Sequence, residues 1–143
     1  MAIQSFYISI EISEENKKTI VSTTDLKKYK KSDDLMYKGV LYIDNVSTEG
    51  NWWHVSVGLY DLFHSCEMLY KFCREIETVK PNFDFYLLGQ KYKFDFKSIL
   101  DFFLFIYPKI EKSKSDFEEQ YGALSVSPHR FFTFYKRNKH FFR

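Results

Sequence analysis

The chain is poor in the residues that make linkers and cross-links. Among its 143 residues it has only 5 Gly, 3 Pro and 2 Cys. So few Gly and Pro exclude long flexible linkers and low-complexity segments. The length, with 45% hydrophobic and 28% charged residues, fits one globular unit. We therefore expect a single domain over residues 1–143, with a distinct basic and aromatic segment at residues 129–143.

The two cysteines, Cys66 and Cys73, are seven positions apart in what reads as one helix. At a rise of about 1.5 Å per residue their Cα atoms would lie about 10 Å apart. A disulfide needs Cα atoms within about 7 Å of each other. We expect two buried free thiols, which suit a reducing compartment, and so a cytoplasmic protein.

Long hydrophobic runs are also missing. The most apolar stretch, residues 99–107, is interrupted by Asp101 and falls well short of the roughly 20 residues that a spanning helix needs. The first residues, Met1 to Phe6, have neither the basic nor the hydrophobic region of a signal peptide. We expect no membrane association.

Motifs that carry chemistry are absent from the sequence. There is no His-Glu-x-x-His, no Cys-x-x-Cys and no Gly-rich phosphate loop. His64 and Cys66 would point to different sides of a helix, and His54 and His64 could approach in space although nothing in the sequence forces it. Thiols on an apolar helix face are inert. We expect no metal, no cofactor and no catalytic residue.

One catalytic alternative stays open at the C-terminus. His129, Lys139 and His140 could supply general acid–base chemistry for a small hydrolase or nuclease. Histidines on a basic segment are more often solvated or in contact with phosphate. We therefore rank an enzyme last among the functions considered.

Alternation of apolar and polar residues predicts most of the strands. The clearest pattern is a hairpin whose two strands flank Gly89-Gln90, where Gly in the first loop position favours a type II′ turn. Weaker β-branched character marks residues 18–24, and residues 25–34 read as a solvated loop or short helix. The expected strands cover residues 4–12, 36–46, 52–57, 83–88 and 91–96.

Helical spacing appears twice. Apolar residues recur every three or four positions from Leu62 to Ile76, with Asp61 in the first turn. A second helix over residues 99–112 would begin at Ser98 and kink or restart at Pro108. A separate short helix would begin at Ser115 and end at Gly122, and a last strand would follow in residues 123–126 and again within 129–143.

These elements predict an α+β fold, with an antiparallel sheet of about five to seven strands and two or three helices packed on one face. Aromatic residues make up 20% of the chain. Such side chains dominate both cores and interfaces. A chain that is rich in aromatic side chains and poor in reactive groups indicates a protein that binds another molecule.

The order of elements resembles small bacterial immunity proteins of polymorphic toxin systems, such as those of contact-dependent growth inhibition. The segments that carry the resemblance are Trp52 to Val57, Asp61 to Ile76, Phe83 to Leu88 and Lys91 to Phe96. It implies a cytoplasmic, non-enzymatic inhibitor (an antitoxin) that binds a cognate toxin domain and blocks its active site or substrate groove. The net charge of +2 departs from the acidic character usual against nuclease toxins.

The candidate partner-binding residues are outward-facing aromatics and acids. Strand and helix periods place Trp52, Tyr60 and Tyr86 opposite the core, and Asp84 and Asp95 on the outer faces of the hairpin. Acids in exposed segments would add charge contacts that raise the association rate and specificity. These further acids are Asp33, Asp34, Asp116, Glu118 and Glu119.

The alternative is a small nucleic-acid-binding protein that uses the C-terminal segment. Five cations interleave there with aromatic side chains, a combination that holds single-stranded nucleic acid. A plainer interpretation, which we favour, is an edge strand with buried aromatics and solvated cations. The cations concerned are Arg130, Lys136, Arg137, Lys139 and Arg143.

Overall fold

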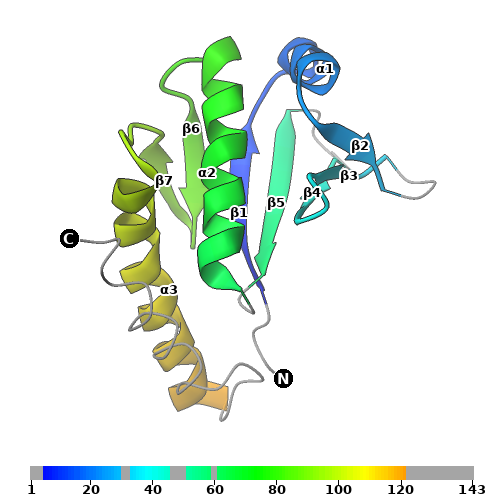
Figure 1. Cartoon of the computed structure of the whole chain (residues 1–143). Coiled ribbons are helices and arrows are strands. Elements are labelled where there is room, and N and C mark those ends of the chain that lie inside the picture. The colour runs from blue at the N-terminus through cyan, green and yellow to red at the C-terminus, as the bar shows by residue number, and fades with distance from the viewer. Residues whose placement is uncertain (1–4, 30–32, 46–50, 59–60, 122–143) are drawn as a thin grey trace.

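The structure is a computed structural model that describes residues 5–29, 33–45, 51–58 and 61–121, with side chains up to residue 112 (Figure 1). The described residues form one seven-stranded antiparallel sheet and three helices, which confirms the predicted α+β class. The strands are β1 (Ser5–Glu11), β2 (Leu26–Lys28), β3 (Leu35–Tyr37), β4 (Leu41–Asp44), β5 (Trp52–Gly58), β6 (Asp84–Leu87) and β7 (Gln90–Lys93). The helices are α1 (Glu14–Thr23), α2 (Leu62–Val79) and α3 (Ile99–Tyr121).

Strand β1 lies inside the sheet, whose order is β2-β3-β4-β5-β1-β6-β7. It pairs along its whole length with β5, from Ser5 opposite Gly58 to Glu11 opposite Trp52. Its other edge pairs with β6. The N-terminal strand therefore joins the β2–β5 half of the sheet to the hairpin of β6 and β7. The predicted strands at residues 4–12 and 52–57 are confirmed.

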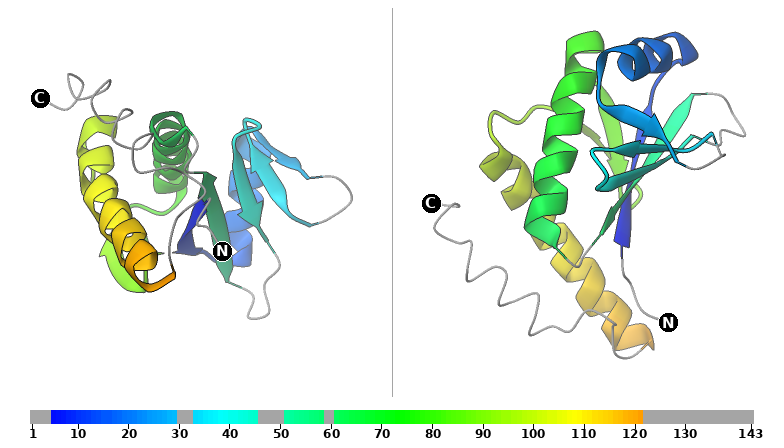
Figure 2. Two further views of the ribbon diagram at one scale, coloured as in Figure 1. Left: turned by 90° about the horizontal axis from the view of Figure 1, so that it is seen from below. Right: turned by 45° about the vertical axis from the view of Figure 1, so that its right-hand side comes forward.

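Helices α2 and α3 lie on the same side of the sheet, and α1 lies near one end of α2 (Figures 1 and 2). The core forms between these helices and the alternate strand residues that face them, such as Ile8, Ile10 and Val55, all fully buried. Cys66 and Cys73 are buried free thiols, as predicted, and burial raises the pKa of both well above the usual value. Among the described residues, no helix is both long and apolar enough to cross a bilayer.

An aromatic cluster joins the hairpin to the two long helices. Phe94, directly after β7, is fully buried and its ring centroid lies 5.1 Å from that of Phe83 and 5.7 Å from that of Phe102 on α3. Tyr70 on α2 contacts both Phe94 and Phe102. Many of the aromatic side chains therefore pack in the core. Each aromatic pair adds about 0.5–1.5 kcal/mol to the stability of the fold beyond the effect of burial.

The aromatic hairpin is confirmed, but its turn lies one residue earlier than predicted. Leu87 pairs with Gln90, so the loop consists of Leu88 and Gly89 rather than Gly89 and Gln90. Both loop residues have positive φ, 51° and 79°, which is the signature of a type I′ turn and not of type II′. The type I′ turn matches the twist of the strands, and this preference outweighs the cost of a left-handed conformation at Leu88.

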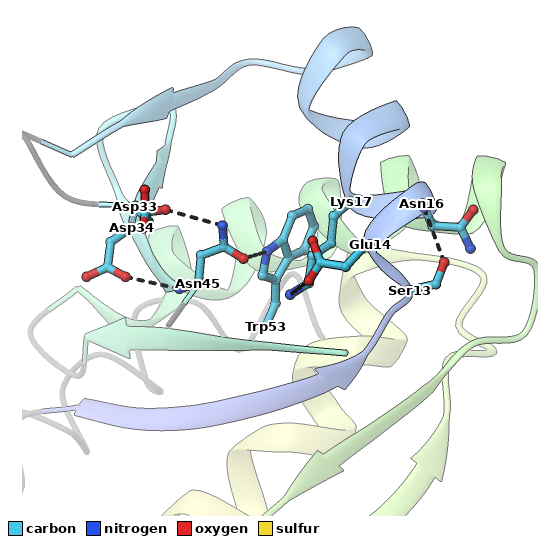
Figure 3. A network of polar contacts seen from close by, with 8 residues as sticks. All are labelled: Ser13, Glu14, Asn16, Lys17, Asp33, Asp34, Asn45 and Trp53. Atoms are coloured by element: carbon cyan, nitrogen blue, oxygen red, sulfur yellow. Dashed lines mark hydrogen bonds and ion pairs between the residues drawn. The ribbon is translucent and has the colours of Figure 1, made fainter. Parts of the chain in front are cut away.

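Residues 14–23 are helical, whereas the sequence predicted a weak β-branched run over residues 18–24. Ser13 begins α1 by accepting a hydrogen bond from the backbone N–H of Asn16 at 3.2 Å (Figure 3). Glu14 and Glu15 occupy the first turn, where the helix dipole favours them. The hydroxyl of Thr19 donates to the carbonyl of Glu15. The cap and the burial of one α1 face, which includes Ile20, outweigh the β preference of the run.

The predicted strand at residues 36–46 is two strands. Lys38 and Gly39 adopt positive φ values of 50° and 70°, and the chain reverses there to pair β3 with β4. Within residues 25–34, predicted as a loop or short helix, Leu26–Lys28 pairs with β3 as strand β2. Burial of Leu26 explains the difference, because its side chain joins the core although its neighbours are polar.

The second and third predicted helices are one. Helix α3 continues from Ile99 to Tyr121 with Pro108 inside it, and Ser98 accepts from the backbone N–H of Asp101 as the predicted cap. Pro108 has no backbone N–H, so the carbonyl of Leu104 lacks its usual helical donor. Both residues lie on the exposed side of the helix, where water can donate to that carbonyl instead. No Gly or Pro interrupts residues 109–121, so the signal at Ser115 does not start a new helix. The predicted strand at residues 123–126 and the segment 129–143 lie outside the described residues.

Removal of one ring from the aromatic cluster should destabilise the whole fold. For Phe94→Ala we expect the free energy of unfolding to fall by about 3–5 kcal/mol, because the change leaves a cavity between β7 and the helices. The matched control Leu104→Ala, at a side chain that is 41% exposed, should change it by less than about 0.5 kcal/mol. Urea denaturation measures both, and similar effects would contradict the described packing.

Candidate functional site

The side of the sheet that faces away from α2 and α3 is the candidate functional site, and we name it the open face. Its residues alternate along each strand with the buried ones, and all are half-buried or exposed. Tyr7, at 55% exposure, is the most exposed large hydrophobic side chain of the described residues. The open face consists of Tyr7, Ser9, Glu11, Tyr42, Asp44, Trp52, His54, Ser56, Asp84, Tyr86, Lys91 and Lys93.

The strand registers align polar residues of the open face in a row across five strands. Each member lies directly opposite the next on the neighbouring strand, from Asp44 on β4 to Lys91 on β7. Side chains opposite one another in an antiparallel ladder have Cβ atoms about 4.5–5.5 Å apart, so they contact each other. In order, the row is Asp44, His54, Ser9, Tyr86 and Lys91.

Aromatic rings gather beside this row. The rings of Trp52 and Tyr86 meet edge to face with centroids 5.3 Å apart, although their strands lie on opposite sides of β1. The His54 ring stacks parallel to Trp52 at 6.1 Å, and its Nδ1 lies 2.7 Å from the hydroxyl oxygen of Ser9. These contacts orient the three rings before any partner arrives, which lowers the entropy cost of binding.

A partly buried polar network holds the strand that presents Trp52, and it includes Asp34, which is buried and not exposed as the sequence predicted, because its carboxylate accepts hydrogen bonds there. The neighbouring Trp53 is fully buried, and its indole N–H donates to the side-chain oxygen of Asn45 at 2.8 Å (Figure 3). The backbone N–H of Asn45 donates to the carboxylate of Asp34 at 3.0 Å, and its side-chain amide donates to the carbonyl of Asp33 at 3.3 Å. Because Trp53 is anchored on the core side, Trp52 must lie on the open face.

Charges occupy the β7 end of the open face. Asp84 forms ion pairs with Lys91 at 3.4 Å and with Lys93 at 3.3 Å. Desolvation acts to raise the pKa of Asp84, but the hydrogen bond from Lys93 and the charge of Lys91 together hold it below its usual value. Asp84 is therefore ionised at neutral pH and committed to two lysines.

The structure brings some of the sequence-predicted partner residues together and leaves others apart. Trp52, Asp84 and Tyr86 share the open face, as predicted from their strand periods. Asp95 is exposed just after β7. Asp116, Glu118 and Glu119 belong to α3, away from this face, and their side chains are outside the description. Tyr60 and the five cations of residues 129–143, namely Arg130, Lys136, Arg137, Lys139 and Arg143, also lie outside it, as do His129 and His140.

Sequence reasoning missed the polar centre of the open face. Ser9, Asp44 and His54 were not among the candidates, although the same alternation that located Trp52 also places them outward. The missing information was the strand order, because only the insertion of β1 between β5 and β6 brings His54 and Tyr86 to either side of Ser9.

In the part of the chain that the structure describes, the Ser9–His54 pair resembles an activated nucleophile, and Asp44 lies opposite His54 on β4. Acyl transfer also needs amide donors for the developing oxyanion. In the described sheet, Ser9 lies in a strand that is paired on both edges, so its backbone groups are committed to the ladders. Within the described residues, no three His, Cys, Asp or Glu side chains gather as metal ligands.

Comparison with known proteins does not add a family. No protein-family model, no curated protein and no solved structure matches the chain. The function is therefore argued from the open face itself.

The hydroxyl of Tyr42 donates to the Asp34 carboxylate, and this bond raises the pKa of Tyr42 to about 12. The bond stabilises the protonated phenol in the folded state, so its contribution is complete below about pH 10, the unfolded value, and is lost as the pH rises through about 12. We expect Tyr42→Phe to be less stable than the wild type at pH 8 and to lose less stability between pH 10 and 12. Urea denaturation across this range measures the difference, and parallel profiles for the two proteins would contradict it.

Proposed function

We propose that the chain is a non-catalytic protein-binding inhibitor that works in the cytoplasm, and most specifically an immunity protein that neutralises a cognate bacterial toxin domain. The observation that carries the proposal is the pre-oriented aromatic pair of Trp52 and Tyr86, half-buried on the open face beside its polar row. Trp and Tyr are the side chains that most often dominate protein–protein binding energy.

The surroundings of the aromatic pair fit the anatomy of a protein interface. Such interfaces have an aromatic centre and a polar rim that excludes water. On the open face, Glu11 is exposed directly opposite Trp52, and Lys93 and Tyr7 are exposed on the same face. Hydroxyl and imidazole groups at Ser9 and His54 offer polar contacts within it.

Rigidity supports an inhibitory role. The open face is built on a continuous sheet whose other side packs against α2 and α3, so its side chains are positioned by regular backbone rather than by loops. A rigid surface loses little conformational entropy on binding and can occlude a toxin site without doing chemistry. The resemblance of element order to immunity proteins points to the same role.

The proposal predicts that one protein partner depends on the aromatic pair. The tagged chain would be captured from its source cell at low and at high salt, with and without nuclease, in wild-type, Trp52→Ala/Tyr86→Ala and Leu104→Ala forms. We expect one stoichiometric protein partner that survives nuclease and high salt. The double variant should weaken its binding by at least about thirtyfold, since one hot-spot residue is worth about 2 kcal/mol.

A growth assay separates inhibition from mere binding. The captured protein should arrest growth when it is expressed alone, and co-expression of the wild-type chain or of the Leu104→Ala control should restore growth. The double variant should fold normally, as thermal unfolding will report, but fail to restore growth. Recovery of nucleic acid that salt removes, in place of a protein partner, would refute the proposal.

A further inference from the structure

Strand β7 forms one edge of the described sheet, and its ladder fixes which backbone groups face outward. The backbone N–H of Phe94 donates to the carbonyl of Phe83 at 2.9 Å, so these two residues are a hydrogen-bonded pair. Because antiparallel ladders alternate, Gln90 and Tyr92 also point their backbone groups toward β6. The N–H and C=O groups of Lys91 and Lys93 therefore point away from the sheet.

The side chains of the same two residues carry the positive charge of this edge. Those of Lys91 and Lys93 are 57% and 70% exposed, and both contact the single carboxylate of Asp84. The charge of Glu11 also acts on Lys91. The outward backbone positions and two exposed cationic side chains coincide on alternate residues of β7.

Tyr92, between the two lysines, faces the helical side of the sheet and offers an aromatic surface. Tyr92 is half-buried, and its ring meets that of Phe105 on α3 edge to face at 4.8 Å. The amine of Lys109 lies over the Phe105 ring at 3.8 Å from its centroid. The same amine lies 5.5 Å from the centroid of the Tyr92 ring, so a side chain placed opposite Tyr92 would meet aromatic carbon beside a cation.

We propose that β7 is a docking edge for an extended segment of the partner protein with the pattern acid–apolar–acid. The segment would extend the sheet by one strand, with its two acids opposite Lys91 and Lys93 and its apolar residue opposite Tyr92. The proposal rests on the proposed function, because it assumes a protein partner, and it specifies the chemistry of that partner. Lys91 also lies opposite Tyr86, so this edge lies next to the aromatic pair of Trp52 and Tyr86 on the open face.

Charge argues against the two other occupants that the chain itself could supply. A second copy that docked by a fully overlapped β7 would place Lys91 opposite Lys93, and like charges opposite one another destabilise a ladder. Residues 129–143 contain five Lys or Arg and no acid, so they too would add positive charge beside these lysines. The same lysines that repel these strands attract an acidic one, which gives the edge its specificity.

The test is an NMR titration of the ¹⁵N-labelled full chain with the blocked peptide Thr-Glu-Val-Glu-Thr. We expect the amide signals of Lys91 and Lys93 to shift more than those of Gln90 and Tyr92, because only the former face the added strand. The matched peptide with Lys in place of Glu should bind at least about tenfold more weakly. For the Lys91→Glu/Lys93→Glu chain the preference should reverse.

A proline substitution isolates the backbone contribution. Lys93→Ala removes one charge but keeps the outward N–H, whereas Lys93→Pro removes both and leaves the β6–β7 ladder intact. We expect Lys93→Pro to bind the acidic peptide about fivefold more weakly than Lys93→Ala, the loss of one hydrogen bond. The spectra also report whether each variant is folded.

Three outcomes would overturn the docking edge. These are no shifts at Lys91 and Lys93, equal binding of the acidic and basic peptides, or stronger shifts of the same amides by oligothymidylate. None of these outcomes alters the growth assay with Trp52→Ala/Tyr86→Ala, so the docking edge can fail while the proposed function stands. If the growth assay failed while the acidic peptide bound as expected, the proposed function would be contradicted and the docking edge would stand.

Discussion

The ladder between β1 and β5 determines which side chains of the sheet are buried and which are offered to a partner. A slip of one residue would exchange the two faces of a strand, so the register must be strongly specified. Ile8, Ile10 and Trp53 specify it from the core side, where all three are fully buried. Because β1 also pairs with β6, the same register places Trp52 and Tyr86 on one face. The open face is therefore a consequence of core packing in the central strands.

The aromatic residues divide between two tasks that the structure keeps apart. Phe83, Phe94 and Phe102 pack against each other and join the hairpin to the helices. Trp52 and Tyr86 lie across the sheet from that cluster and remain half-exposed. Burial of the first group supplies the stability that allows the second group to stay accessible, since exposed aromatics contribute little to folding and much to binding.

The sequence predicted the elements whose periodicity was undisturbed. The alternation around Ile8 and the helical spacing around Cys66 appear in the structure at the expected places, and the aromatic hairpin appears with its turn one residue earlier. The prediction of secondary structure was wrong where burial in the core outweighed the local conformational preference of the residues. The run around Ile20 has β-branched character but is held as a helix by a cap and by core contacts, and Leu26 is drawn into a strand by its burial. Such forces act between distant segments, and no local pattern contains them.

The candidate site shows the same division. Periodicity alone placed Trp52, Asp84 and Tyr86 outward, since this needs only the period of one strand. Their assembly with Ser9 and His54 required the strand order, in which β1 separates β5 from β6. The open face, rather than any single residue in it, was what the sequence could not predict.

The central claim is that a partner protein covers the open face and leaves the helical side exposed. Hydroxyl-radical footprinting of the chain, free and in complex with its captured partner, measures this directly at individual side chains. The account predicts that Tyr7, Trp52 and Tyr86 lose most of their oxidation in the complex while Leu104 on α3 keeps its own. Protection of Leu104 with unchanged oxidation of Trp52 and Tyr86 would contradict it.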